Sequence, residues 1–111
     1  MTFNCNGVRA AAKTGFFDWL PDQNVDVVCL QETKAQVHQL EDAIFHPTGY
    51  QVCYFDAQKK GYAGTALFSK LEPKKITKGL GFDISDTEGR FIQADFKDLS
   101  VASMYLPSGS S

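Results

Sequence analysis

The sequence predicts an α/β fold built on a mixed β-sheet with flanking helices. A very short strand, a helical segment and an apolar strand open the chain, which is the order of a β-α-β unit. The later segments are β-rich and are joined by short turns, so they are expected to pair as antiparallel hairpins. Together these two observations indicate a mixed sheet within an α/β sandwich.

The β-α-β unit is expected over residues 2–31. Residues 2–5 would form a very short strand that runs into Asn6-Gly7, a typical turn pair. Residues 26–31 are mostly Val, Cys and Leu, bounded by polar residues. Such a run is typical of a parallel strand that is buried on both faces.

Two helices are expected on the sheet. Residues 8–20 contain helix formers with apolar residues that can share one face, although Gly15 weakens or breaks this helix and Pro21-Asp22 ends it. Residues 36–44 are predicted to form a second, short helix.

Five further strands complete the expected sheet. Residues 91–96 and 99–105 are separated by only two residues, which is hairpin spacing. The other runs, which are rich in β-branched and aromatic residues or alternate in polarity, are 51–56, 64–69 and 74–78.

The composition is that of one globular domain or a piece of a larger one. The chain has 111 residues, of which 43% are hydrophobic and 22% charged, and a net charge of −2. This charge does not by itself predict a nucleic-acid binder, although a basic cleft can exist on an acidic molecule. No apolar run approaches the ~20 residues of a membrane helix. Three cysteines without a CxxC pair favour free thiols and a cytoplasmic location.

Glu32 is the most informative candidate for chemistry. It follows the predicted buried strand, and ligand sites in open α/β sheets gather at the carboxyl ends of strands. Asn4 and Asn6 lie at the same end of the preceding strand, so the three side chains could meet. One carboxylate with amide oxygens suits Mg²⁺ or Mn²⁺ rather than Zn²⁺. Taken singly, each residue is better explained by its turn or loop.

Several blocks together resemble the exonuclease III family of abasic-site (AP) endonucleases, in the endonuclease/exonuclease/phosphatase superfamily. The resemblance covers essentially the whole chain in the family's order, and its most specific block is Gln-Glu-Thr-Lys after a hydrophobic strand. The blocks are residues 3–10, 27–34, 60–66, 88–90 and 105–109.

The resemblance implies part of a four-layer α/β/β/α sandwich of the DNase I-like type and a metal-dependent DNA-repair nuclease. The implied reaction is hydrolysis of phosphodiesters at abasic sites and 3′ termini of double-stranded DNA, with Mg²⁺ or Mn²⁺. By similarity, Glu32 and Asn6 lie at the metal, Asn4 holds neighbouring catalytic groups and water, and Tyr105 contacts the scissile phosphate. A divalent ion and hydrogen-bond donors would offset the charge that develops on the phosphate oxygens.

Five residues are the candidate DNA contacts, since Lys and Arg on phosphates supply most sequence-independent affinity. They are Arg9, Lys34, Lys60, Tyr62 and Arg90. Solvated surface charge explains Lys60 and Arg90 equally well. Neither a membrane nor an obligate protein partner is inferred.

Residues 1–111 are expected to be the amino-terminal portion of a single domain of this superfamily. The family's Gly-Asp-x-Asn and Ser-Asp-His blocks, which supply the water-activating residue and further metal ligands, do not occur in the sequence. The apolar sheet also has too few helices to cover it. The chain by itself is therefore expected to be inactive.

The sequence alone leaves two other functions open. Some bacterial relatives are catalytically silent catabolite repression control proteins that assist an RNA-binding partner, and the Leu-Pro-Ser-Gly ending at 106–109 resembles that branch as well. A phosphatase of the same superfamily that acts on lipids or nucleotides is the third candidate. The Gln-Glu-Thr-Lys and Gly-Tyr-x-Gly blocks favour DNA over that substrate.

Overall fold

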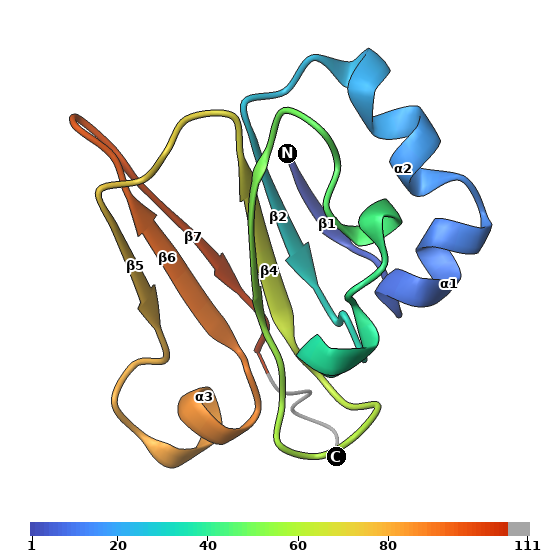
Figure 1. Ribbon diagram of the computed structural model, residues 1–111. Coiled ribbons are helices and arrows are strands. Elements are labelled where there is room, and N and C mark those ends of the chain that lie inside the picture. The colour runs from blue at the N-terminus through green and yellow to red at the C-terminus, as the bar shows by residue number, and fades with distance from the viewer. Residues whose placement is uncertain (107–111) are drawn as a thin grey trace.

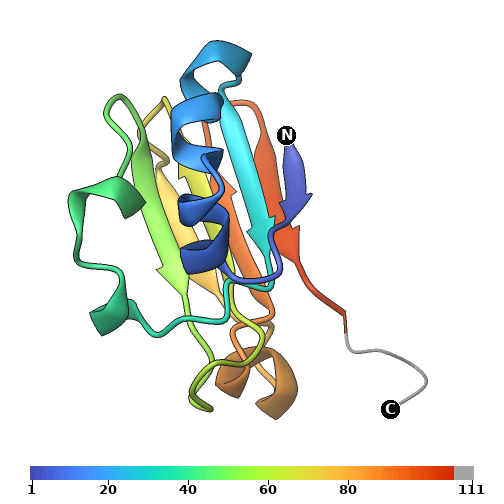
Figure 2. The same cartoon turned by 90° about the vertical axis from the view of Figure 1, so that its right-hand side faces the viewer.

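The computed structural model describes residues 1–106, apart from the side chains of residues 84 and 85. Its elements form three stacked layers, in which helices cover one sheet and a second sheet packs on the other face (Figures 1 and 2). The α/β sandwich expected from the sequence is confirmed. Residues 107–109 of the last family block lie outside the described residues.

The first sheet is the predicted mixed sheet. Its β1 and β2 are parallel, with Asn4 opposite Gln31, and its other neighbours are antiparallel. The parallel pair places the carboxyl ends of β1 and β2 at one end of the sheet. In spatial order the strands are β1 (Thr2–Asn4), β2 (Val27–Gln31), β4 (Thr65–Ser69) and β3 (Gln51–Phe55).

The second sheet is antiparallel and contains the predicted hairpin, in which Asp95 pairs with Ser100. Its strands are β5 (Lys75–Lys78), β6 (Phe91–Asp95) and β7 (Ser100–Met104). Ile92 and Ala94, on one face of β6, pack with Cys29 and Leu67 between the two sheets. This burial is the reason that these strands form a separate layer rather than an extension of the first sheet.

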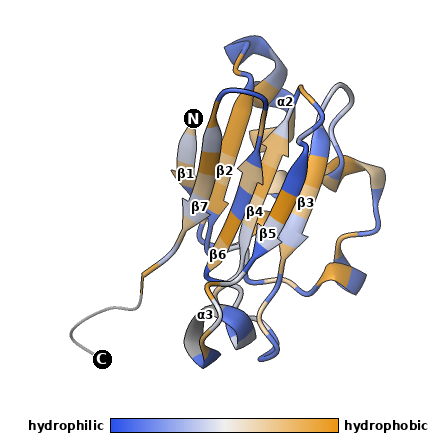
Figure 3. Ribbon diagram, turned by 90° about the vertical axis from the view of Figure 1, so that its left-hand side faces the viewer, coloured by the Kyte–Doolittle hydropathy of each residue, from blue (hydrophilic) through white to orange (hydrophobic). Residues whose placement is uncertain are grey.

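The strand β2 is buried on both faces, as its composition predicts. Val28 and Leu30 face the helices in a cluster with Phe68, whereas Cys29 faces the second sheet. Figure 3 shows the resulting run of hydrophobic colour along β2. Full burial of a side chain of this size stabilises the fold by roughly 1.5–3 kcal/mol, so β2 anchors both layers and holds its carboxyl end in a fixed place.

The helical regions are shorter than the sequence predicts. Gly15, with a φ of 96°, breaks residues 8–20 into α1 (Val8–Lys13) and α2 (Phe16–Trp19), and a 3₁₀ turn, η1 (Leu20–Gln23), follows. The break at Gly15 is therefore confirmed.

The predicted helix over 36–44 is wrong. This segment forms two 3₁₀ turns, η2 (Val37–Gln39) and η3 (Ala43–Phe45). Asp56 accepts the Val37 N–H and Asp42 accepts the Ile44 N–H. These side chains compete with the helical backbone pattern and favour short turns.

One further helix, α3 (Asp83–Thr87), was not predicted. It consists of only five residues without an apolar period, so its sequence contains no recognisable helix signal.

Candidate active site

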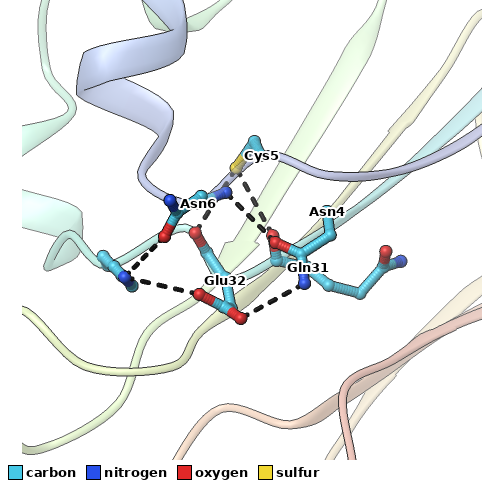
Figure 4. A network of polar contacts seen from close by, with 6 residues as sticks. Asn4, Cys5, Asn6, Gln31 and Glu32 are labelled. Carbon is cyan, nitrogen blue, oxygen red and sulfur yellow. Dashed lines mark hydrogen bonds and ion pairs between the residues drawn. The ribbon is translucent and has the colours of Figure 1, made fainter.

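Side chains from two strand ends converge where β1 and β2 finish (Figure 4). The Asn4 Nδ2 group donates to Glu32 Oε1 at 3.2 Å. The Lys34 ammonium lies 2.7 Å from Asn6 Oδ1 and 3.4 Å from Glu32 Oε2. The predicted meeting of Asn4, Asn6 and Glu32 is therefore observed, and Lys34 joins the same cluster.

Backbone hydrogen bonds hold this cluster in place. The N–H groups of Gly7 and Val8 donate to the carbonyls of Glu32 and Thr33 at 2.7 and 2.9 Å. On the other side, Lys34 N–H donates to the Ala63 carbonyl at 2.8 Å. The segment after β2 is thus fixed between the turn after β1 and the loop before β4.

The backbone at the site is strained. Asn6, Glu32 and Lys34 have φ values of 47°, 57° and 52°, a region that residues with a side chain rarely adopt. Each such residue costs of order 1–3 kcal/mol and persists only where its surroundings determine it, which often occurs at functional sites.

Gly64 allows the loop before β4 to approach Thr33 closely. A Cβ atom at Gly64 would lie 2.2 Å from Thr33 Oγ1, and its φ is 89°. Thr33 itself is 1% exposed and its N–H donates to the Gly64 carbonyl at 3.1 Å. Only glycine satisfies both the space and the backbone angle here.

Tyr105 reaches the site from the second sheet. It follows β7, where the buried Ser103 hydroxyl donates to the Leu30 carbonyl at 2.8 Å and accepts from Gln31 Nε2 at 3.0 Å. These bonds connect β7 to the end of β2. Sequence reasoning did not single out Ser103, because a serine in a strand gives no signal of a bond between sheets.

The pKa values of Glu32 and Tyr105, the two ionisable groups at the centre of the site, shift in opposite directions. A hydrogen bond with Tyr105 is the largest cause that lowers the pKa of Glu32, and the bond from Asn4 adds to it. The same bond with Glu32 is the largest cause that raises the pKa of Tyr105. At neutral pH Glu32 is therefore an anion, and Tyr105 keeps the proton it can donate.

Cys5 lies beneath this cluster. Its thiol lies 3.4 Å from the carbonyl oxygens of both Gln31 and Glu32, which can share its single proton. Burial raises the pKa of Cys5 to about 11. The thiol is accordingly neutral and structural, as a core cysteine is expected to be.

An open groove of about 690 Å³ adjoins the cluster, and several of the residues around it are basic. Arg9, which is exposed, donates to the Lys34 carbonyl at 3.2 Å. Lys60 is also exposed, and Tyr62 is 39% exposed in the same loop. The residues that line the groove include Arg9, Lys13, Lys34, Phe45 and Gly61.

Arg90 differs from the other four candidate DNA contacts. It is 5% exposed, and its guanidinium donates to Glu88, Tyr62 and the Tyr105 carbonyl. Its contact with DNA stays a prediction. Glu88 belongs to the Glu-Gly-Arg block but was assigned no role from the sequence.

The donors at the cluster fit part of a divalent metal site. Glu32 and Asn6 both present oxygen atoms to the Lys34 ammonium, so this position already attracts a cation. Carboxylate and amide oxygens suit Mg²⁺ or Mn²⁺. Within residues 1–106, no three His, Cys, Asp or Glu side chains gather as a metal cluster. The role of Glu32 as a metal ligand stays a prediction.

The fold and the site define an α/β-sandwich protein of the DNase I-like type, with a polar site at the carboxyl ends of two parallel strands. The sequence pattern of the Endonuclease/Exonuclease/phosphatase family matches residues 1–107. The chain belongs to this family, whose members are hydrolases, and the resemblance to its exonuclease III branch is confirmed.

Individual relatives agree with this assignment. The exodeoxyribonuclease of Bacillus subtilis (strain 168) is 40% identical over 109 residues, which are 97% of this chain and 42% of that protein. The DNA repair nuclease APEX1 of Danio rerio is 36% identical over 111 residues, which are 98% of this chain and 36% of that protein.

A solved structure shows the same fold. The AP endonuclease from Archaeoglobus fulgidus superposes with a TM-score of 0.80 at 33% identity, over 96% of this chain and 40% of that chain. The chain therefore spans about two fifths of the length of these relatives. No helix in the described part of the chain is long and apolar enough to cross a membrane.

Proposed function

We propose that the protein is a DNA-repair nuclease that hydrolyses phosphodiesters at abasic sites and at 3′ termini of double-stranded DNA, with Mg²⁺ or Mn²⁺. The observation that supports it most is the convergence of Glu32, Asn4 and Tyr105 from three separate segments. The names of the relatives, an exodeoxyribonuclease and DNA-repair nucleases, point the same way.

Each residue of the cluster has a definite role in this proposal. Glu32 and Asn6 would hold the metal ion, which would supply positive charge against the negative charge that builds up on the phosphate. Asn4 fixes the Glu32 carboxylate through the bond at 3.2 Å. Tyr105 donates its phenolic proton in a hydrogen bond to a phosphate oxygen, where such a donor is most effective in the transition state.

The groove beside the cluster is the proposed path of the DNA backbone. Arg9 and Lys34 line it, and Lys60 and Tyr62 are exposed on the neighbouring loop. Contacts of Lys and Arg with phosphates make binding depend strongly on salt. Arg90 was also predicted to contact DNA, but its burial favours a role in holding neighbouring side chains.

The remaining residues needed for hydrolysis are expected outside these 111 residues, so the 111-residue chain alone is expected to be inactive. We place the active protein in the cytoplasm. No obligate protein partner is part of the proposal.

The test uses the protein expressed from its complete gene and a labelled duplex that contains one abasic site. Nicking that requires Mg²⁺ and stops with EDTA is the expected result, with an undamaged duplex as the control. Absence of Mg²⁺-dependent nicking, together with intact binding to an RNA-chaperone partner, would favour the silent regulatory relative. Release of phosphate from lipids or nucleotides without nicking would favour a phosphatase.

A further inference from the structure

Arg90 is the most enclosed cation at the site end of the molecule. It stands directly before β6 and is 5% exposed, although charged side chains are seldom buried unless they are paired. Its Nε group donates to Glu88 Oε1 at 2.7 Å. The ion pair with Glu88 raises the pKa of Arg90 against the opposing effect of burial, so the guanidinium stays charged.

The other two guanidinium nitrogens reach two tyrosines. Nη2 donates to the Tyr62 hydroxyl at 3.0 Å, and Nη1 donates to the Tyr105 carbonyl at 3.2 Å. The Tyr105 N–H donates back to the Arg90 carbonyl at 2.9 Å. A planar guanidinium can direct three nitrogens to three partners at fixed angles, which an ammonium cannot.

Both tyrosine rings also lie against the guanidinium. The Arg90 Cζ atom is 4.9 Å from the Tyr105 ring centroid and 5.6 Å from that of Tyr62. Within about 6 Å such contacts are attractive. The two rings belong to different segments, since Tyr62 lies in the loop before β4 and Tyr105 follows β7. Arg90 therefore links a loop to a strand end.

The Glu-Gly-Arg block fits this purpose. A Cβ atom at Gly89 would lie 2.4 Å from the Phe55 carbonyl oxygen, so only glycine lets the block pass this close to the end of β3. The Glu88 carbonyl also accepts the Gly64 N–H at 3.2 Å. The block is thus held against the loop that carries Tyr62.

We propose that Arg90 is a positioning residue that holds Tyr62 and Tyr105 as one unit, with the Tyr105 phenol set toward Glu32 and Tyr62 set toward the DNA strand. That these tyrosines meet phosphate and DNA rests on the proposed function. The linkage of the two tyrosines through Arg90 does not, and it can be measured separately.

The first test is spectroscopic and uses the protein expressed from its complete gene, with ¹³C at the tyrosine Cζ atoms. Arg90→Lys keeps the charge but cannot reach all three partners, so the signals of Tyr62 and Tyr105 should shift. The signals of Tyr50 and Tyr54 should stay in place, because their hydroxyls donate to the carbonyls of Val25 and Phe45, away from Arg90. Unmoved Tyr62 and Tyr105 signals, or equal movement of all four, would overturn the proposal.

A second substitution tests the linkage itself. Tyr62→Phe removes only the hydroxyl that accepts from Arg90, and it should shift the Tyr105 signal. The same change in the Arg90→Lys background should leave that signal where it is. Tyr50→Phe is the matched control, because it removes a phenol that bonds to the Val25 carbonyl instead. A Tyr105 signal that responds to Tyr62→Phe equally in both backgrounds contradicts the linkage.

The kinetic test is a double-mutant cycle on the abasic duplex. Arg90→Lys should lower kcat by about ten- to a hundredfold, as loss of a residue that orients an active-site group does. In the Tyr105→Phe background the same change should lower kcat by no more than about threefold, because coupled residues are not additive. Equal losses in both backgrounds would contradict the proposal. The spectra are read whether or not DNA is cleaved, so failure of the nuclease proposal and failure of this inference are distinguishable.

Discussion

The two ends of the sandwich each carry a carboxylate whose pKa is lowered, yet only one of them resembles an active site. At one end Glu32 accepts a hydrogen bond from Asn4 at 3.2 Å, and the Tyr105 phenol is the largest cause that lowers the pKa of Glu32. At the other end Asp95 accepts from Ser100 at 2.7 Å and from Gln93 at 2.8 Å. The side chains that hydrogen-bond to Asp95 belong to its own hairpin, and the charge of Lys75 on the neighbouring strand adds to their effect. By contrast, Asn4 and Tyr105 reach Glu32 from distant segments.

The comparison teaches that a lowered pKa does not by itself identify a functional group. Hydrogen bonds within a hairpin lower the pKa of Asp95 at a turn that has a structural role. The Glu32 end adds strained backbone, since four of the non-glycine residues with positive φ lie there: Asn6, Glu32, Lys34 and Ala63. Strain that several segments maintain together is the better indicator of function.

Among variants that leave the Glu32 charge in place, the largest expected effect comes from removing the Tyr105 phenol, which influences Glu32 from the second sheet. Tyr105→Phe removes the phenolic donor but keeps the ring, and it should slow nicking of the abasic duplex by roughly tenfold to a thousandfold. Single-turnover assays on the protein from the complete gene would measure this. Nicking at the wild-type rate by this variant would mean that the Tyr105 phenol contributes no more to cleavage than the hairpin that carries Asp95.

A smaller effect is expected from the glycine that lets the loop approach Thr33. Gly64→Ala should lower the free energy of unfolding by roughly 2–4 kcal/mol, because left-handed strain and a steric clash combine. Gly61→Ala is the matched control in the same loop, since no atom lies within 4 Å of its Cβ position. Its cost should be about 1 kcal/mol.

Urea unfolding of both glycine variants and the wild type supplies the measurement. Equal losses for the two variants would show that the close approach at Thr33 does not constrain the site.

The smallest effect is expected at the hairpin end. Ser100→Ala should raise the pKa of Asp95 toward its ordinary value, because the Ser100 bond is the largest cause that lowers it. A depressed carboxyl pKa stabilises the fold above the unfolded-state pKa, and this stabilisation is lost as pH falls through the folded-state pKa. The variant should therefore be slightly less stable than the wild type at neutral pH and equal to it in strong acid.

Carboxyl titration by NMR and melting curves at both pH values would check this prediction. Nicking should be unchanged in Ser100→Ala. A fall in nicking would contradict the assignment of Asp95 to a structural role.

Much of the fold could be predicted, because burial leaves a clear pattern in the sequence. The apolar run of β2 indicated a strand covered on both faces, and the spacing around Lys97-Asp98 indicated the hairpin of β6 and β7. The predicted helix over 36–44 failed because Asp42 and Asp56 accept backbone N–H groups there. The Asp42 bond is local, but the Asp56 bond depends on tertiary position, because Asp56 is nineteen residues from its partner.

The candidate site was predictable only in part. Parallel neighbouring strands have their carboxyl ends at the same edge of the sheet, and this rule correctly predicted that Asn4 lies beside Glu32. Nothing in the sequence pattern showed that Arg90 is buried or that Ser103 bonds to β2, because both depend on how the two sheets stack. Residues on separate layers have no fixed spacing in the sequence, so side chains that act between layers were missed or given surface roles.

The most direct test of the account compares the two carboxylates in one assay. Glu32→Gln and Asp95→Asn remove the same charge from opposite ends of the molecule and keep the side-chain shape. With limiting Mg²⁺ and an abasic duplex, Glu32→Gln should lower the rate of nicking by orders of magnitude, since a well-placed metal ion supplies several kcal/mol of stabilisation to the transition state. Asp95→Asn should cleave at the wild-type rate. Unchanged activity of Glu32→Gln, or an equal loss in both variants, would contradict the claim that the end of β2 is the active site.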